Sequence, residues 1–531
     1  MDSFFKRLWS SRWFRCFTIL AGVAAFASLV VGYVDWTGAR RMEAAREMFA
    51  REGESLDMHG AAPDPAPDGQ NFFAIPALKD LALCPTDPKD NGELGLKRKR
   101  LLDAGLPNFN LISSSVTPDG RGTPPSIAPG PGLGVPCDLK AWAAWLRRTG
   151  SPPAPPETAH PARDVLGALS RDDGLIHELA QGLRRPESQW TPAWRTRVLP
   201  DDPDVIAVPH YLATQSLIPM LCLRAAAAAR AGDATAAHQS LLIAARLNQA
   251  YMHEPLLIGI LLGCAQSAGI HGAVWELCDA HCGTADQYKA LQDALTKMDY
   301  RQGFLCAERG ETAGCVNFLE YLRRTRNPDI FESFPIPGAD SDSTAYSIVW
   351  HLIPDGLFEE NEATVGEWGL NYIIKPLRDE GLMRMLAKGK ELEAIIEKNK
   401  EEPARHLDSA LAWLSLTPIR GVTYKVIYTQ AVENQAIAAC ALERYRIEHG
   451  KYPDTLAAAN HPGEKPIPRD MISGKPMGYR KTPDGRYVLW CVGFSGLDHG
   501  GTRIPDLKDP AHTHFGYPTY KGDWVWSYSG N

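Results

Sequence analysis

Several short groupings of histidine, cysteine and acidic residues have the side chains that metal sites use. His177 to Gln181 comes close to the HExxH zinc helix, but Gln181 replaces the second histidine, so the two-histidine geometry is lost. A second grouping falls on one expected helix and consists of His271, Cys278, His281 and Cys282. Its spacing matches no standard zinc motif, and core cysteines beside an amphipathic histidine explain it better.

The C-terminal tail holds a further candidate metal site. His512 and His514 stand at strand-like spacing near Asp506 and Asp509, and imidazole with carboxylate suits a transition metal. An exposed loop pair is the simpler explanation, and we prefer it. The sequence has no Gly-rich phosphate loop or dinucleotide fingerprint. It therefore identifies no catalytic residue, and a metal-dependent periplasmic hydrolase stays the alternative to a non-enzymatic role.

The bulk composition bounds the possible classes of protein. A chain of 531 residues is long enough for roughly two to four domains, because one hydrophobic core seldom grows beyond ~250 to 300 residues. Hydrophobic residues make up 44% and charged residues 22%, which are ordinary globular values. The net charge of -7 lacks the basic excess that nucleic-acid binding needs, so nucleic acid is not expected as a partner.

An uncharged apolar run from Cys16 to Val34 predicts one transmembrane helix near the N-terminus. Its 19 residues meet the length of ~20 that a helix needs to cross a hydrocarbon core. Cationic residues precede it (Lys6, Arg7, Arg12, Arg15) and tryptophans flank it (Trp9, Trp13, Trp36). The positive-inside rule then keeps the N-terminus in the cytoplasm and the bulk of the chain outside the cytoplasmic (inner) membrane, although Arg40, Arg41 and Arg46 reduce the asymmetry. A cleaved signal peptide is the competing interpretation, but its cut would fall inside the apolar run.

The fold class we expect is mainly α, in four regions. They are a membrane anchor with a helical stalk (1–52), a Pro/Gly-rich irregular region (53–165), a helical domain (166–420) and a small α+β module with a β-hairpin (421–531). In the irregular region, Asn71 to Leu81 and Leu139 to Arg148 are the expected apolar anchors. A short stalk over Thr37 to Glu52 is expected to continue the membrane helix outward.

Helical periodicity dominates the third region. The expected helices are 211–230, 235–248, 255–282, one from Thr284, and 300–326, followed by a loop over 327–362 and a helix near 368–400. One alanine-rich stretch around Gly232 resembles a tetratricopeptide-type hairpin. We therefore expect stacked, solenoid-like helical hairpins in this part of the chain.

The tail changes from helical to strand periodicity. A helix ends at Gly450, and two strands over 477–481 and 486–492 flank a Pro-Asp-Gly turn, which predicts a β-hairpin. A last strand is expected at Trp524, Trp526 and Tyr528, whose alternation is typical of a buried face.

This order of helix, tight stop, hairpin and glycine-rich loop resembles the C-terminal part of the major (G-type) pseudopilin of type II secretion systems. The likeness covers 423–506 and rests on Tyr445, His449, Gly450, Tyr452, Pro453, Leu456, Pro468, Asp470, Gly474, Lys475, Pro476, Tyr479, Tyr487, Gly493, Gly496, Asp498, Gly500 and Gly501. The whole chain also resembles uncharacterised bacterial single-pass membrane-anchored proteins, a likeness that implies no activity.

Two departures limit what the resemblance implies. A pseudopilin leader has Gly and Glu where this chain has Cys16 and Ala21, so processing and polymerisation through this helix are not expected. The family's loop binds calcium, and Ser495 stands where it usually has Asp. Asp498, Asp506 and Asp509 remain as the candidate calcium ligands, against the alternative of a solvated acidic loop.

Ten cysteines remain once Cys16 is set aside, an even number compatible with disulfides in an oxidising compartment. Cys84 with Cys137 and Cys306 with Cys315 are possible pairs, and buried free thiols are the alternative. The function we expect is a membrane-anchored extracytoplasmic scaffold or interaction protein. It would bind a protein partner in the cell envelope, with a secretion-related role implied by its tail.

Overall fold

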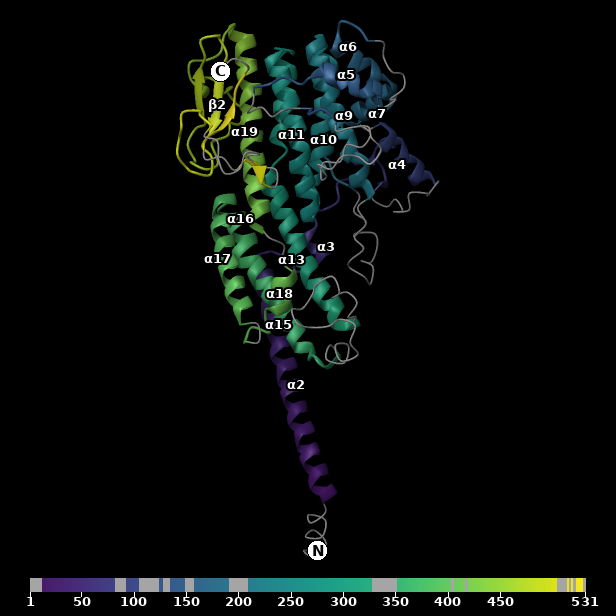
Figure 1. Ribbon diagram of the computed structural model, residues 1–531, viewed down its shortest axis with the longest axis vertical. Helices are drawn as coiled ribbons and strands as arrows, with labels where there is room; N and C mark the ends of the chain where they lie inside the picture. The colour runs from purple at the N-terminus through teal and green to yellow at the C-terminus, as the bar shows by residue number, and fades with distance from the viewer. Residues whose placement is uncertain are drawn as a thin grey trace, which may run out of the picture.

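A long N-terminal helix, α2 (Arg12–Arg51), projects from the foot of an elongated body (Figure 1). The structure is a computed structural model that describes residues 12–81, 92–104, 124–127, 134–148, 157–190, 209–326, 351–402, 405–415, 419–503, 513–514, 517–518 and 522–528. The body is mainly helical, and its small sheet lies at the end opposite the N-terminus.

The two halves of α2 have different surroundings. From Cys16 to Tyr33 nearly every side chain is exposed, although most are apolar. Farther along, Met42, Ala45 and Phe49 are buried, because their spacing of three and four residues forms one apolar stripe. The predicted stalk is therefore wrong in one respect, since the helix continues but its second half packs inside the body.

Two described helices are long and apolar enough to cross a membrane. One is α2, with its apolar part exposed, and the other is α11 (Leu257–Asp279), which is mostly buried in the body. By length and composition alone, α2 fits a membrane span or a signal sequence, and α11 fits the core helix of a globular body.

Five consecutive helices form the centre of the body, close to where periodicity predicts them. They are α9 (Pro209–Ala231), α10 (Ala234–Gln249), α11, α12 (Ala285–Thr296) and α13 (Tyr300–Thr325), with the short η5 (Ala250–His253) between α10 and α11. Side-chain caps define their starts: Asp233 accepts from the Ala236 amide, Thr284 forms a capping box with Gln287, and Asp299 accepts from the Gln302 amide. The α9–α10 hairpin turns at Gly232, whose φ is +80°.

The next part of the chain differs from the prediction. Of the expected loop, 327–350 lie outside the described residues, but α15 (Asp355–Trp368) is a helix that already includes Glu362. The single helix predicted over 368–400 is also wrong. The chain passes through a π-helical turn, η7 (Gly369–Ile374), into α16 (Lys375–Asp379), breaks at Gly381, whose φ is +96°, and resumes as α17 (Leu382–Glu401) and α18 (Ala410–Ser415).

The described parts of the Pro/Gly-rich region contain the short elements α3 (Met58–Ala61), η1 (Phe72–Ala74), α4 (Glu93–Ala104) and α5 (Leu139–Arg148). α6 (Pro161–Leu169) begins in this region and continues into the predicted helical domain, where η3 (Ser170–Asp172) and α7 (Asp173–Gly182) follow. Both expected anchors are confirmed, because Phe72 and Phe73 are fully buried and Trp142 packs edge-on against Trp145 in the core.

The C-terminal module begins with α19 (Ile419–His449), which ends at Gly450 with a φ of +75°. After η9 (Leu456–Ala459), the strands β1 (Gly478–Lys481), β2 (Tyr487–Cys491) and β5 (Trp524–Trp526) form an antiparallel sheet in the order β1-β2-β5. The predicted hairpin is confirmed, and so is a last strand at Trp524. Two short strands, β3 (Thr513–His514) and β4 (Tyr517–Pro518), pair separately.

One continuous hydrophobic core runs from Met42 in α2 to Tyr528 after β5. Cys137 and Cys306 form no disulfide within the described part of the chain. Cys306 and Cys315 lie nine residues apart on α13, about 13 Å along a helix at a rise of ~1.5 Å per residue, which is too far for a disulfide. The predicted bond between them is therefore wrong, and Cys84 lies outside the described residues.

Candidate functional site

Two histidine–glutamate pairs join α11 (His271) and the turn that follows it (His281) to α19. His271 Nε2 lies 2.5 Å from Glu433 Oε2, and His281 Nδ1 lies 3.2 Å from Glu443 Oε2. Both pairs have the same sequence separation of 162 residues, so the two helices run in the same direction. The histidines that the sequence suggests as zinc ligands thus face carboxylates from a distant helix.

Glu433 is the more deeply enclosed carboxylate of the two. Its side chain has no exposed surface, and its Oε1 atom has no hydrogen-bond partner among the described residues. Burial raises the pKa of Glu433, while the pairing with His271 opposes that rise. Because both side chains are buried, water cannot replace the contact between His271 and Glu433 in the folded protein.

Glu443 gathers three donors at the upper end of the same interface. It accepts from His281, from Arg446 Nε at 3.0 Å and from the Tyr452 hydroxyl group. Tyr452 is buried beside Tyr487, with ring centroids 4.9 Å apart, so the carboxylate links both helices to β2. Nearly every acceptor site of this buried group is occupied, as a stable interior carboxylate requires.

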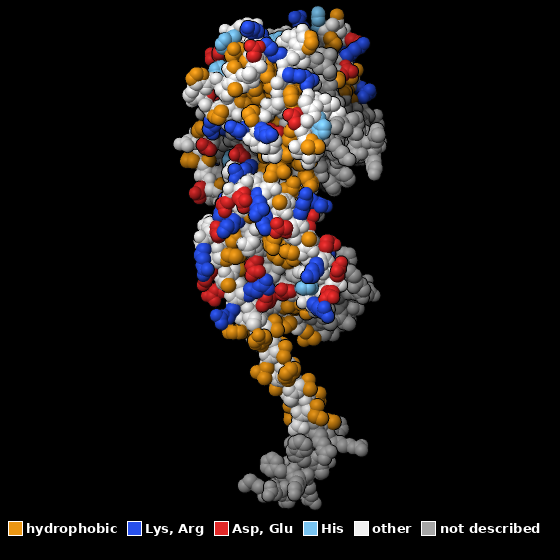
Figure 2. Space-filling model, turned by 90° about the vertical axis from the view of Figure 1, so that its left-hand side faces the viewer, with side chains coloured by type: hydrophobic (Ala, Val, Ile, Leu, Met, Phe, Trp, Pro, Cys, Tyr) orange, Lys and Arg blue, Asp and Glu red, His pale blue; other side chains and the backbone are white. Residues whose placement is uncertain are grey.

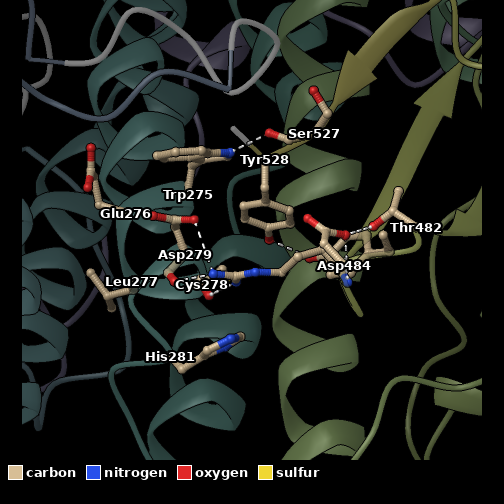
Figure 3. A network of polar contacts seen from close by, with 12 residues as sticks. Trp275, Glu276, Leu277, Cys278, Asp279, His281, Thr482, Asp484, Ser527 and Tyr528 are labelled. Atoms are coloured by element: carbon tan, nitrogen blue, oxygen red, sulfur yellow. Dashed lines mark hydrogen bonds and ion pairs between the residues drawn. The ribbon is translucent and has the colours of Figure 1, made fainter. Parts of the chain in front are cut away.

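The C-terminal end of α11 is the point where the sheet docks onto the helices (Figure 3). Arg486, just before β2, donates to the carbonyl oxygens of Cys278 at 3.4 Å and Asp279 at 2.8 Å. Its guanidinium group also lies 5.0 Å above the Tyr528 ring. A cation here completes hydrogen bonds that the last turn of a helix leaves open and complements the helix dipole.

Neighbouring residues on α11 tie in two more segments. Trp275 Nε1 donates to the Ser527 carbonyl at 2.8 Å, next to β5 (Figure 3). Glu276 accepts from the Cys137 amide at 2.5 Å and from Arg230 Nε of α9 at 2.7 Å. The end of α11 therefore holds the irregular region, the central helices and the sheet in one network.

The acidic loop of the tail has a structural arrangement of its own. Asp498 Oδ1 accepts from Trp490 Nε1 at 2.9 Å and from the Gly500 amide at 2.8 Å, and these hydrogen bonds lower the pKa of Asp498. The other two candidate calcium ligands, Asp506 and Asp509, lie outside the described residues, as does His512. No cluster of three potential metal ligands occurs in the part of the chain that the structure describes.

A buried aspartate that the sequence reasoning missed holds this loop. Asp523 is fully buried and accepts from the amides of His499 and Gly501 at 3.0 and 2.8 Å. Asp470 accepts from the amide of Val492, the residue after β2, at 3.0 Å. Both carboxylates accept hydrogen bonds from backbone N–H groups and so order the glycine-rich backbone.

Surface cavities of about 510, 620 and 560 Å³ occur among the described residues, and the third is lined by Cys137 and Arg230 of the network around Glu276. Neither histidine–glutamate pair lines any of these three cavities. A substrate would have to separate α11 from α19 to reach His271 or Glu433. The arrangement is thus suited to fixing elements in place.

Comparisons with known proteins do not extend this description: no protein-family model, no curated protein and no solved structure matches the chain.

Proposed function

We propose that this protein is a single-pass membrane protein whose body is an extracytoplasmic interaction scaffold. The observation that carries the proposal is α2, which is exposed and apolar over its first half and built into the core over its second. Exposed apolar surface around a whole helix is costly in water and is favourable in lipid. The proposed location is the cytoplasmic (inner) membrane.

The charge distribution supports an N-terminus in the cytoplasm. The cations before the apolar run favour that orientation, and of those after it, Arg41 is neutralised inside the body. Its guanidinium group lies 2.7 Å from Glu360 and 2.9 Å from Glu367. Arg41 is thus engaged with the body, and four cationic residues before the span face Arg40, Arg41 and Arg46 after it.

The C-terminal module is the proposed contact surface, at the end of the body farthest from the N-terminus (Figure 1). The pseudopilin-like pattern of this module motivates an association with a secretion or envelope assembly. Leu497 on its glycine-rich loop is a large apolar side chain that is 65% exposed. It is therefore the position at which we test a protein contact through this loop.

The anchor is tested by paired substitutions in the exposed half of α2. Val23 and Phe26 are exposed, so changing them leaves the packing of the body intact. Two arginines there should oppose membrane insertion by roughly 5 to 7 kcal/mol, at ~2.5 to 3.5 kcal/mol each. After alkaline carbonate extraction, we expect the parent and a Val23→Leu/Phe26→Leu control to stay in the membrane pellet and Val23→Arg/Phe26→Arg to be lost from it.

The mass of the membrane-bound chain separates an anchor from a signal peptide. A retained anchor predicts a mature protein that still contains Cys16 to Val34. A mature chain that begins after this run, or release of the parent by carbonate, would contradict the proposal.

The scaffold role is tested by crosslinking in membranes followed by co-purification. We expect an envelope protein to be recovered with the parent and lost with Leu497→Asp. Met383→Asp on α17 is the matched control, because Met383 is also exposed but lies on another element. An unchanged recovery with Leu497→Asp would exclude this loop as the contact surface.

A further inference from the structure

Large side chains are exposed around the point where α2 enters the body. Tyr33 and Trp36 on α2 are 66% and 56% exposed, and Leu352, three residues before α15, is 72% exposed. The start of α15 lies against α2 here, because the Gly356 amide donates to Asp35 Oδ1 at 2.8 Å. Figure 2 shows hydrophobic side chains at the foot of the body, continuous with those of the projecting helix.

The direction in which α2 leaves the body is fixed. The helix is unbroken from Arg12 to Arg51, so no flexible linker separates the apolar half from the buried half. At the crossing with α15, a Cβ atom on Gly38 would collide with the Gly356 carbonyl oxygen, which shows how closely the two backbones approach. The ion pairs of Arg41 lie about one turn farther along the same helix. The apolar segment is therefore joined to the body by continuous helix that is packed against α15.

The length of the apolar segment then sets the height of the body. Nineteen residues at ~1.5 Å each span about 28 Å, which nearly equals the ~30 Å of a hydrocarbon core. Tyr33 and Trp36 are separated by about 4.5 Å along the axis, within the ~5 to 8 Å that the headgroup layer adds on each side. Both aromatic side chains thus fall at the membrane–water boundary.

We propose that the foot of the body, formed by Tyr33, Trp36, Arg40 and Leu352, is a second membrane-contact surface seated in the headgroup layer. The inference rests on the proposed anchor and adds to it a fixed posture of the body on the bilayer. Aromatic rings with one polar edge favour this layer, and Arg40, whose guanidinium group lies 5.1 Å above the Trp36 ring, can extend its charge toward lipid phosphate. Leu352 adds apolar area from a different segment of the chain.

Photocrosslinking of the full chain in phosphatidylcholine vesicles tests this surface. The photoreactive residue p-benzoylphenylalanine replaces Leu352 in one variant, Phe26 in a second and Leu497 in a third. All three side chains are exposed, so the substitutions should not alter the fold, and an unchanged urea midpoint verifies this. We expect lipid adducts, identified by the mass of the modified peptide, at positions 352 and 26 and none at 497.

The variant at Phe26 separates a failure of the second membrane-contact surface from a failure of the proposed anchor. Lipid adducts at 26 without any at 352 would overturn the seated foot and leave the anchor standing. The absence of adducts at both would overturn the anchor as well. A crosslink from 352 to a second copy of the chain, in place of lipid, would overturn the membrane contact and identify this face as an interface between copies.

Discussion

Glu308 on α13 is a carboxyl group that folding places where it cannot easily ionise. It is 4% exposed, and its Oε1 atom has no hydrogen-bond partner among the described residues. Burial, with a smaller effect of nearby Glu311, raises the pKa of Glu308 from 4.5 to about 8. Because this pKa is raised on folding, the stability linked to it is fully present below pH 4.5 and is lost as the pH rises through 8.

Glu308→Gln removes this pH-dependent cost and keeps the size of the side chain. A shift from 4.5 to about 8 corresponds to roughly 5 kcal/mol at ~1.36 kcal/mol per unit. We therefore expect the free energy of unfolding of Glu308→Gln, relative to the parent, to increase steadily between pH 4.5 and 8 and to reach a plateau of that order above pH 8.

Urea denaturation of the full chain in detergent micelles, followed by near-ultraviolet circular dichroism, measures this difference across the pH range. Glu43→Gln is the matched control, because Glu43 is an exposed glutamate of α2. It should leave the pH dependence of the parent unchanged. A difference between Glu308→Gln and the parent that stays constant from pH 4.5 to 9 would refute the reasoning, because it would mean that Glu308 ionises in the folded protein as easily as in the unfolded one.

Three further substitutions test other contacts. Gly38→Ala should destabilise the fold by ~1 to 3 kcal/mol in thermal unfolding, because the added Cβ meets the α15 backbone. Gly389→Ala, with open space around it, should be neutral or slightly stabilising, and equal effects of the two changes would contradict the close crossing. Glu433→Ala should cost ~3 to 5 kcal/mol in urea denaturation because it leaves a buried histidine unpaired, and a loss below ~1 kcal/mol would show that the pair carries little charge. Arg486→Ala removes charge-assisted hydrogen bonds to the end of α11, each worth ~1.5 to 3 kcal/mol. Limited proteolysis should therefore release the sheet sooner than in the parent, and an unchanged digestion rate would argue against this docking contact.

The central helices could be predicted because the chain carries its own boundary signals. Asp233, Thr284 and Asp299 are N-cap residues placed directly before apolar periodic segments, and their caps form in the structure. The turn between β1 and β2 also has a local signal, since Gly485 supplies the positive φ of +80° that this turn requires.

The errors arose where tertiary contacts outweigh local pattern. The start of α15 looked like an acidic loop, but Asn361 is buried and binds the Leu407 carbonyl and the Leu411 amide, and Glu362 meets Arg323. The apolar spacing continued across Gly381, which concealed the break between α16 and α17. Local periodicity cannot reveal partners supplied by distant segments.

The paired histidines and glutamates illustrate the same limit in the candidate site. His271 and His281 are ten residues apart, as are Glu433 and Glu443, and this equal spacing is visible in the sequence. The equal spacing brings each histidine to a glutamate only because α11 and α19 pack in parallel. Asp523 gave no signal either, because its partners are backbone amides more than twenty residues away.

The topology of the chain tests the central claim most directly. Cysteines introduced by Ser3→Cys and Leu497→Cys, each in a Cys16→Ser background, are treated with a membrane-impermeant maleimide on intact spheroplasts. Because the native Cys306 and Cys315 are partly exposed, labelling is scored only on the peptide that contains the introduced cysteine, identified by its mass. The account predicts labelling of the Leu497→Cys peptide before lysis and of the Ser3→Cys peptide only after lysis. Labelling of Ser3→Cys on intact spheroplasts, with Leu497→Cys protected until lysis, would contradict a body held outside the cytoplasm.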